Sequence, residues 1–413
     1  MDRLYLSPGM FGFGRLATYD YFAHVERALM RRFADARRTL EVHVVDVSPT
    51  ASIRRRAVRL AELVAKTSDD HEGTIHLLGH STGGLDARLV ASPSARLPTA
   101  KDNLAWLSRL RSVTTMSTPH YGTPLASFFA TVSGQRMLYA VSALTFIGLS
   151  LGAPPLAAAS ALVVAIGRID RTLGIELRIL DRTTDALLGV LEPAASKEVR
   201  GYLDAIRRDQ GAMIQLTPEA MDLFLAGVED RPDVFYQCTC AQAPAPSPSM
   251  LARSFGGPWK ALSSAIFTTM YGITARYDER YPCASPDPGD AVDQALRAAF
   301  GKTPGARAND GVVPVLSQVW GHVAWAGYAD HLDVLGHFPG AVEPRPFWAS
   351  LFGRGERKPL EVVAEVAVAA GGVRPDPGAD ARHVDWLRSG AGFDERGFGL
   401  LMDALASGML AAC

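Results

Sequence analysis

A serine flanked by glycines, between a strand-like run and a helix-like run, constrains this chain more than any other feature. The segment Gly79-His80-Ser81-Thr82-Gly83 fits G-x-S-x-G, the run 74–79 is strand-like, and the run 83–90 has helical spacing. A serine on such a tight turn needs glycine on both sides, because side chains there would collide with the neighbouring elements. The pattern predicts that Ser81 is a nucleophile held above the edge of a sheet, at the N-terminus of a helix.

The first third of the chain alternates strand-like and helix-like segments. Strand patterns cover residues 4–7, 40–47, 74–79 and 113–117, and helix patterns cover 19–32, 53–65 and 83–90. Such alternation is typical of a parallel sheet with helices packed on both faces. We therefore predict an α/β chain with the α/β-hydrolase fold and a mostly parallel sheet of about six strands.

The alternation stops near residue 122. From there to residue 265 the pattern is mainly helical, and strand character returns at 268–277 and 320–328. The 413 residues are enough for one large domain with a sizeable insertion. The sequence predicts three parts: a first core part over 1–121, a helical lid or cap insertion over 122–265, and a second core part over 266–413 that ends in a helical tail.

The predicted insertion contains a long run without charge. No charged residue lies between Arg136 and Arg168, but Gly152-Ala153-Pro154-Pro155 divides this run into two pieces. Each piece is shorter than the roughly 20 apolar residues that a membrane span needs. The sequence favours a lid hairpin over an apolar pocket, with a spanning helix or a plain buried helical pair as alternatives. We expect five side chains to contact substrate: Phe11, His80, Leu138, Leu144 and Phe146.

Composition and charge exclude some partners. The net charge is −1 and 21% of residues are charged, so there is no basic excess for nucleic acid. Met1-Asp2-Arg3 leads directly into the first strand pattern and not into a cleavable signal. We expect a cytoplasmic protein, with peripheral membrane association through the apolar lid or signal-independent export as alternatives.

The four cysteines do not form a zinc-binding pattern. Cys238 and Cys240 have no further cysteine or histidine at the spacing of a zinc site. We expect reduced thiols. A disulfide from Cys283 to Cys238 or Cys240 is the alternative, and it would suit an oxidising compartment.

A glycine-rich loop follows the first strand pattern. Hydrolases with a G-x-S-x-G turn take one oxyanion donor from an early loop and one from the residue after the nucleophile. In the loop 7–14 this assigns the backbone N–H groups of Met10 and Thr82. The spacing of Gly9, Gly12 and Gly14 does not fit the G-x-G-x-x-G of a dinucleotide site.

A serine nucleophile needs a base and a buried carboxylate that orients the base. In this fold the acid and then the histidine follow the serine along the chain. Asp310 lies in a turn before the last strand pattern and His331 directly follows that pattern, so we predict them as acid and base. The alternatives in the same region or near the serine are Asp287, Asp290, Asp330, His120, His322 and His337.

Four segments together resemble the bacterial triacylglycerol lipases, which are α/β-hydrolases with a helical lid. These segments are Gly79–Gly84, Ser117–Pro124, Asn309–Gly311 and Asp330–Asp333. The oxyanion loop departs from the family, because Pro8-Gly9 stands where the family has His-Gly. The resemblance also implies a structural calcium near the catalytic histidine. Asp333 matches one ligand and Asp290 is a second candidate, whereas His337 stands where an oxygen ligand is expected.

The motifs predict a serine carboxylester hydrolase, a lipase or esterase that acts on hydrophobic acyl esters through an acyl-enzyme. This chemistry requires no cofactor. An acyltransferase, a thioesterase or a polyester depolymerase would use the same three residues. A hydrolase-fold protein that only binds a membrane or a partner is a further alternative.

Overall fold

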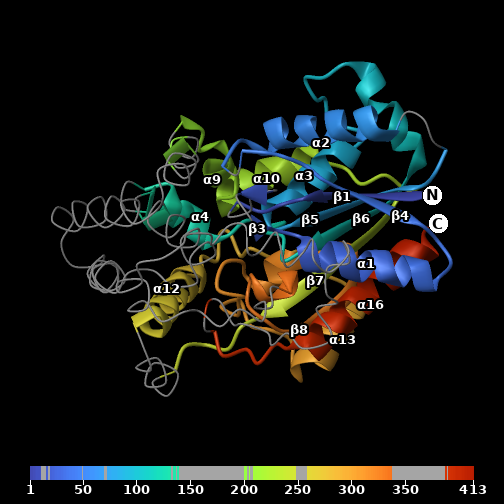
Figure 1. The fold of residues 1–413 in the computed structure, drawn as a ribbon. Helices are drawn as coiled ribbons and strands as arrows, with labels where there is room; N and C mark the ends of the chain where they lie inside the picture. Colours follow the sequence, from blue (N-terminus) through green and yellow to red (C-terminus); the bar gives the residue numbers. More distant parts are fainter. Residues whose placement is uncertain are drawn as a thin grey trace, which may run out of the picture.

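Six parallel strands form the central sheet, in the order β4-β1-β5-β6-β7-β8 (Figure 1). The computed structural model describes residues 1–10, 15–16, 19–48, 50–68, 72–131, 134–135, 137–138, 200–201, 204, 208–247, 258–336, 387 and 389–413. The strands are β1 (Asp2–Ser7), β4 (Leu40–Val44), β5 (Ile75–His80), β6 (Leu110–Met116), β7 (Phe235–Gln242) and β8 (His322–Tyr328). A short antiparallel pair, β2 (Arg15–Leu16) and β3 (Tyr19–Asp20), lies outside this sheet. The architecture confirms the predicted α/β class and strand number, and it is consistent with an α/β-hydrolase fold.

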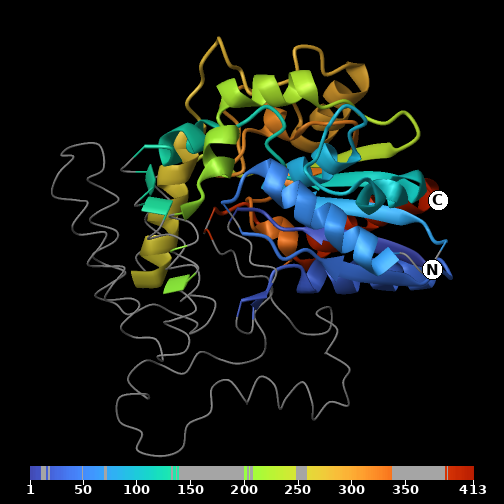
Figure 2. The ribbon, with the colours of Figure 1, turned by 90° about the horizontal axis from the view of Figure 1, so that it is seen from above.

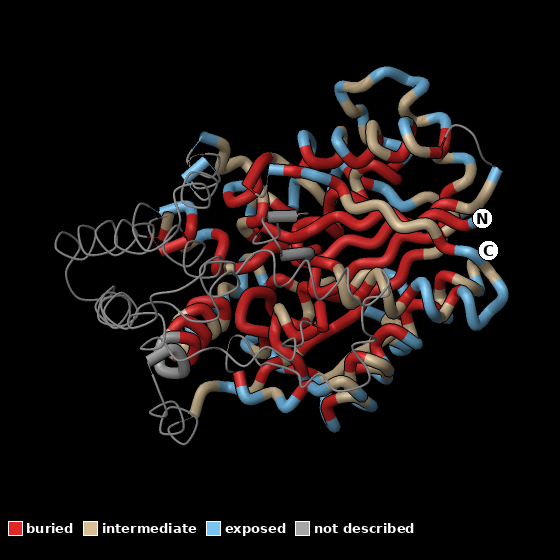
Figure 3. The backbone as a smooth tube through the Cα atoms, in the orientation of Figure 1, coloured by how far each residue is buried: buried red, intermediate tan, exposed pale blue. Residues whose placement is uncertain are grey.

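Helices cover both faces of the sheet. One face packs against α1 (Ala23–Asp35) and α16 (Glu395–Ala411), and the other against α2 (Ile53–Ser68) and α3 (Thr82–Ala91) (Figure 1). Successive side chains of a strand point to opposite faces, so Leu4 and Leu6 join the first cluster and Tyr5 joins the second. Figure 3 shows that the central strands are buried along their length, which explains their continuous apolar runs.

The carboxyl ends of the strands lie at one end of the molecule and the chain termini at the other. Figures 1 and 2 show α4 (Pro124–Phe129) and α12 (Pro258–Thr274) beyond the carboxyl ends. The short helices α9 (Gly211–Gln215) and α10 (Pro218–Gly227) lie between α4 and α12 in the chain, and α9 packs against α4. Open parallel sheets build their sites at this edge.

The strands and helices predicted for the first third are confirmed, with ends shifted by a few residues. The largest shift is at the first helix, which begins at Ala23 because β3 occupies Tyr19–Asp20. The last predicted strand is confirmed as β8, and the predicted C-terminal helix as α16.

Two predictions beyond residue 122 are wrong. The range 122–265, predicted as a helical lid, contains β7, which lies inside the sheet between β6 and β8. The range 268–277, predicted as a strand, belongs mostly to helix α12. Its β-branched and aromatic residues favour a strand locally, but Phe267, Met270 and Thr274 repeat at helical spacing and are buried on one face.

Most of the apolar run of the predicted lid, residues 139–199, lies outside the described residues. Within the described part of the chain, no helix is long and apolar enough to span a membrane. All four cysteines are free thiols, so the structure forms no bridge from Cys283 to Cys238 or Cys240.

Candidate active site

Ser81 lies at the turn from β5 to α3, as the sequence predicts. Its φ of 55° and ψ of −126° lie in a region that side chains rarely adopt, and its N–H donates to the Met116 carbonyl at 2.8 Å. A Cβ on Gly79 would lie 2.1 Å from the Gly83 backbone, and one on Gly83 would lie 2.0 Å from the Ser7 carbonyl oxygen. The turn therefore requires both glycines. The side chain of Ser81 stays 7% exposed at the carboxyl end of the sheet.

A buried ion pair anchors the loop after β1. Arg56 of α2 and Asp86 of α3 are 1% and 0% exposed, and Arg56 Nε lies 2.9 Å from Asp86 Oδ2. Arg56 Nη2 also donates to the Pro8 carbonyl, and Ser7 Oγ donates to Asp86 Oδ2 at 2.7 Å. Burial raises the pKa of Asp86, and the Arg56 charge opposes that shift. The pair thus ties the expected oxyanion loop to both helices on that face.

The sequence did not reveal this role of Arg56. Residues 54–56 are three arginines on a helix that reads as having a basic outer face. Arg54 and Arg55 are exposed, whereas Arg56 is fully buried. The helical period puts one of the three on the inner face, and only the partner Asp86 shows that a charge is accommodated there.

The two expected oxyanion donors belong to segments next to the serine: Thr82 follows Ser81 in the chain, and Met10 follows Gly9, which approaches Ser81. Thr82 is the first residue of α3, where backbone N–H groups have no partner within the helix, and Met10 belongs to the anchored loop. Among the described residues, neither the Met10 N–H nor the Thr82 N–H donates a hydrogen bond to a backbone carbonyl. Both groups are available to bind a developing negative charge.

Gly9 is in close contact with the nucleophile. A Cβ at this position would lie 2.7 Å from Ser81 Cβ, a contact that cannot relax by rotating a side chain. We expect Gly9→Ala to push the Met10 N–H away and to lower kcat/KM about 100-fold, the usual effect of losing one oxyanion donor. Gly227→Ala is the matched control, because a Cβ on Gly227 meets nothing within 4 Å. Equal ester hydrolysis rates in the two variants would show that the loop is not at the site.

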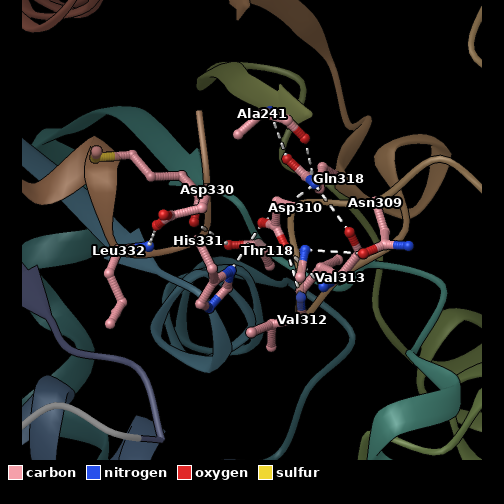
Figure 4. Close-up of polar contacts among 12 residues, drawn as sticks. Thr118, Ala241, Asn309, Asp310, Val312, Val313, Gln318, Asp330, His331 and Leu332 are labelled. Atoms are coloured by element: carbon pink, nitrogen blue, oxygen red, sulfur yellow. Dashed lines mark hydrogen bonds and ion pairs between the residues drawn. The ribbon is translucent and has the colours of Figure 1, made fainter. Parts of the chain in front are cut away.

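Asp310 is a fully buried carboxylate with four donors around it (Figure 4). Its Oδ1 accepts from the N–H groups of Val312 and Val313 at 2.9 and 2.7 Å. Its Oδ2 accepts from His331 Nδ1 at 2.8 Å and from Gln318 Nε2 at 3.3 Å. Gln318 is a site residue that the sequence did not indicate, since nothing in its local pattern distinguishes it. These bonds hold the carboxylate in one orientation toward the histidine.

His331 follows β8 and is 1% exposed. Its Nδ1 bonds to Asp310, and its backbone N–H donates to the Asp310 carbonyl at 3.0 Å. Because a carboxylate only accepts, Nδ1 carries the proton, and the neutral ring then has an unprotonated Nε2. Nε2 forms no hydrogen bond among the described residues and is available as a base.

His80 contacts both the ring and the backbone of His331. The two imidazole centroids are 4.7 Å apart, and His80 Nε2 bonds to the His331 carbonyl at 2.9 Å. His80 directly precedes Ser81, so this contact joins His331 to the residue next to the candidate nucleophile. The described contacts include no hydrogen bond between Ser81 Oγ and His331, a bond that often forms fully only with substrate bound.

The alternative acids and bases lie elsewhere. Asp330 Oδ1 accepts from the N–H groups of Leu332 and Asp333 and so shapes the turn. Asp287 and His322 are exposed, and His337 lies outside the described residues. His120 is fully buried, and burial together with the nearby Arg88 charge holds its pKa well below its usual value. In the described part of the chain, His331 is the histidine bonded to a buried carboxylate.

The predicted substrate contacts are mostly untested. Phe11, Leu144 and Phe146 lie outside the described residues, and Leu138 is buried. His80 is fully buried with both ring nitrogens bonded within the protein, which does not agree with a direct role in binding substrate. A hollow of about 390 Å³ near β7 and β8 is lined in part by Tyr271, Lys302, Arg307 and Tyr328, but not by Ser81 or His331.

The described residues alone do not form the calcium site that the resemblance implies. No three His, Cys, Asp or Glu side chains among them are grouped to hold a metal ion. Asp290 is exposed in the first turn of α13 (Asp290–Phe300), and Asp333 Oδ2 accepts from the Asp330 N–H at 2.8 Å. We derive no step through calcium.

Comparison with known proteins gives one partial sequence match. No family model matches the chain. A curated protein is 32% identical over 148 residues. That protein is a triacylglycerol lipase of Vibrio cholerae. The match covers 36% of this chain and 41% of the lipase, and over that length it confirms the resemblance to bacterial triacylglycerol lipases.

Several solved structures are similar in part. EstA from Clostridium botulinum has a TM-score of 0.45 and 18% identity, covering 81% of this chain and 82% of its own. Lipase 1 from Pelosinus fermentans has a TM-score of 0.44 and 16% identity, covering 84% of this chain and 96% of its own. Staphylococcus hyicus lipase has a TM-score of 0.39 and 17% identity, covering 81% and 89%.

Proposed function

We propose that this chain is a serine carboxylester hydrolase of the lipase and esterase type, with Ser81, Asp310 and His331 as its catalytic residues. The observation that carries the proposal is the buried Asp310–His331 pair, which contacts His80, the residue directly before a serine on a strained strand-to-helix turn. This arrangement has the parts that an acyl-transfer site needs: a nucleophile, a base and a carboxylate that orients the base.

The proposed reaction begins when His331 Nε2 removes the proton of Ser81 Oγ. The oxygen attacks the ester carbonyl carbon, and the N–H groups of Met10 and Thr82 bind the resulting oxyanion. The carbonyl re-forms, the bond to the alcohol breaks, and the imidazolium gives its proton to the leaving alkoxide. Water then attacks the acyl-enzyme with the same histidine as base and releases the acid. Asp310 stabilises the imidazolium in both halves of the cycle.

Hydrophobic acyl esters are the proposed substrates. The resemblance to triacylglycerol lipases and the uncharged run between Arg136 and Arg168 both support an apolar acyl group. The same run would suit contact with a lipid surface. Acyl transfer, thioester cleavage and polyester cleavage use identical catalytic residues, so the acceptor and the leaving group distinguish them.

A covalent probe tests the chemistry without knowledge of the natural substrate. We expect a fluorophosphonate to label the chain once, on the peptide that carries Ser81. We also expect p-nitrophenyl esters from acetate to palmitate to be hydrolysed, with kcat/KM rising beyond the shortest chains. An added acceptor alcohol would give a new ester if the enzyme is a transferase. A chain that neither reacts with the probe nor hydrolyses any ester in the series would contradict the proposal and favour a binding role.

A further inference from the structure

A buried series of hydrogen bonds joins the oxyanion loop to the catalytic histidine, and the reaction described above does not use it. The Gly9 backbone approaches the Tyr21 hydroxyl, and its N–H lowers the pKa of that hydroxyl as a donor would. That hydroxyl lies 2.6 Å from His80 Nδ1, and His80 Nε2 lies 2.9 Å from the His331 carbonyl oxygen. Tyr21 is 2% exposed and His80 is 0% exposed.

The donor and acceptor of each hydrogen bond follow from the His331 carbonyl, which can only accept. The His331 carbonyl can only accept, so His80 Nε2 carries a proton. In the uncharged imidazole Nδ1 then accepts, and the Tyr21 hydroxyl must donate to it. The Tyr21 oxygen is then left as an acceptor facing the Gly9 N–H. Burial raises the pKa of Tyr21 far above its usual value, so the hydroxyl keeps the proton that it donates.

We propose that Tyr21 and His80 are positioning residues, which together hold the oxyanion loop and the His331 backbone at fixed positions relative to Ser81. This inference rests on the proposed function, because it assigns to the two side chains the placement of that function's base and oxyanion donors.

The contacts run from the oxyanion loop at Gly9 to the backbone of His331, and the proposed reaction needs both of these segments to stay in place. Gly9 precedes Met10, the expected oxyanion donor, and the His331 backbone sets the pivot of the imidazole. A Cβ on Gly9 would lie 3.1 Å from the Tyr21 oxygen and 3.3 Å from His80 Nδ1, so loop and side chains are in close contact. In the family that the motifs resemble, a histidine stands where this chain has Pro8. Proline supplies no side-chain polar group, so the bonds near it come from Tyr21 and from Arg56.

The first test is Tyr21→Phe, which removes the hydroxyl alone. Without it, the Gly9 N–H and His80 Nδ1 lose the partner they share. We expect kcat/KM for p-nitrophenyl esters to fall about 10- to 100-fold, mainly in kcat, because small misplacements of catalytic groups reduce rate this strongly. KM should change less than about two-fold, since the hydroxyl points at protein groups.

Tyr5→Phe is the matched control. Tyr5 is also fully buried, and its hydroxyl lies 2.8 Å from Thr67 Oγ1, away from the catalytic groups. Both variants should unfold at lower temperatures than the wild type, but the Tyr5 variant should keep its kcat. If the Tyr21 variant keeps its kcat as well, or if the two lose activity equally, the positioning role is overturned.

Histidine variants test whether the two residues act together. His80→Gln can still donate to a carbonyl and accept from a hydroxyl, whereas His80→Leu can do neither. We expect activity to fall in the order wild type, His80→Gln, His80→Leu. The double variant Tyr21→Phe/His80→Leu should be no slower than His80→Leu alone, because one series of bonds is broken in both. If the loss of activity in the double variant equals the product of the two single losses, the proposal is contradicted. If the histidine variants do not fold, the comparison of Tyr21→Phe with Tyr5→Phe decides it.

The rate of phosphonylation by a fluorophosphonate separates this inference from the proposed function. If the wild type does not react, the proposed function fails and the positioning role fails with it. If the wild type reacts and Ser81→Ala does not, the proposed function stands. An unchanged rate in Tyr21→Phe would then reject the positioning role alone.

Discussion

Ser81→Ala is expected to lower kcat for ester hydrolysis by about 10⁶-fold while leaving the protein folded. In the proposed reaction this hydroxyl forms the covalent bond to the acyl group, so its loss removes both the base-assisted attack and the acyl-enzyme. The oxyanion donors remain, and they leave a residual rate about 10³- to 10⁴-fold above water. Steady-state kinetics on a p-nitrophenyl ester and labelling by a fluorophosphonate measure the two losses.

Ser117→Ala is the control for this variant. Ser117 follows β6, is fully buried and has a φ of 47°, so alanine meets similar backbone strain at both positions. The Ser117 hydroxyl has no hydrogen-bond partner among the described residues, so its removal breaks no bond there. We expect the control to keep kcat within about three-fold and to show a similar unfolding temperature. Activity in Ser81→Ala close to that of the control would eliminate Ser81 as the nucleophile.

Asp310→Asn is expected to lower kcat by about 10⁴-fold with little change in the folded structure. The reason is that the substitution moves the His331 proton from Nδ1 to Nε2. The asparagine oxygen must face Val312 and Val313, whose N–H groups donate to Oδ1 in the present structure. The amide nitrogen then faces His331 Nδ1 and donates to it. His331 is left with its proton on Nε2, the atom that must accept the proton of Ser81.

Asp330→Asn separates this effect from a general loss of acid groups near the histidine. Asp330 is next to His331 in the chain, but its Oδ1 accepts two backbone N–H bonds that an asparagine oxygen can also accept. We expect this variant to retain kcat within about ten-fold. If Asp330→Asn were instead the slow variant and Asp310→Asn the active one, the assignment of the acid would be wrong.

The sequence predicted the parts of the fold whose local pattern and final environment agree. The central strands β1 and β5 are buried on both faces and contain short apolar runs at residues 4–6 and 77–78, and the helices between the strands have one apolar face. The serine turn was predictable because its backbone tolerates only glycine at two positions. Asp310 and His331 were predicted as acid and base from the order of catalytic residues that such a turn implies, and their side chains lie 2.8 Å apart in the structure.

The parts that the sequence missed depend on partners distant in the chain. Strand β7 carries Gln237 and Thr239, polar residues that suit a surface, yet both are buried. Gln237 is accommodated there because its amide donates to Thr114 of β6 and to the Leu405 carbonyl of α16. Arg56 and Gln318 were missed for the same reason, since Asp86 and Asp310 give them their roles. Such pairings cannot be read from a local pattern.

The helix α16, which packs with α1 against the first strands, has a consequence for how the protein is made. Ser81 leaves the ribosome early, but His331 is 251 residues beyond His80 and α16 comes later still. At roughly 5–20 residues per second, the nucleophile waits about ten to fifty seconds for its base. During that time the apolar face around Leu4 and Leu6 lacks its final cover. Until His331 and α16 are made, the nascent chain therefore lacks the proposed base and the final cover of this apolar face, and the uncovered face is prone to aggregation.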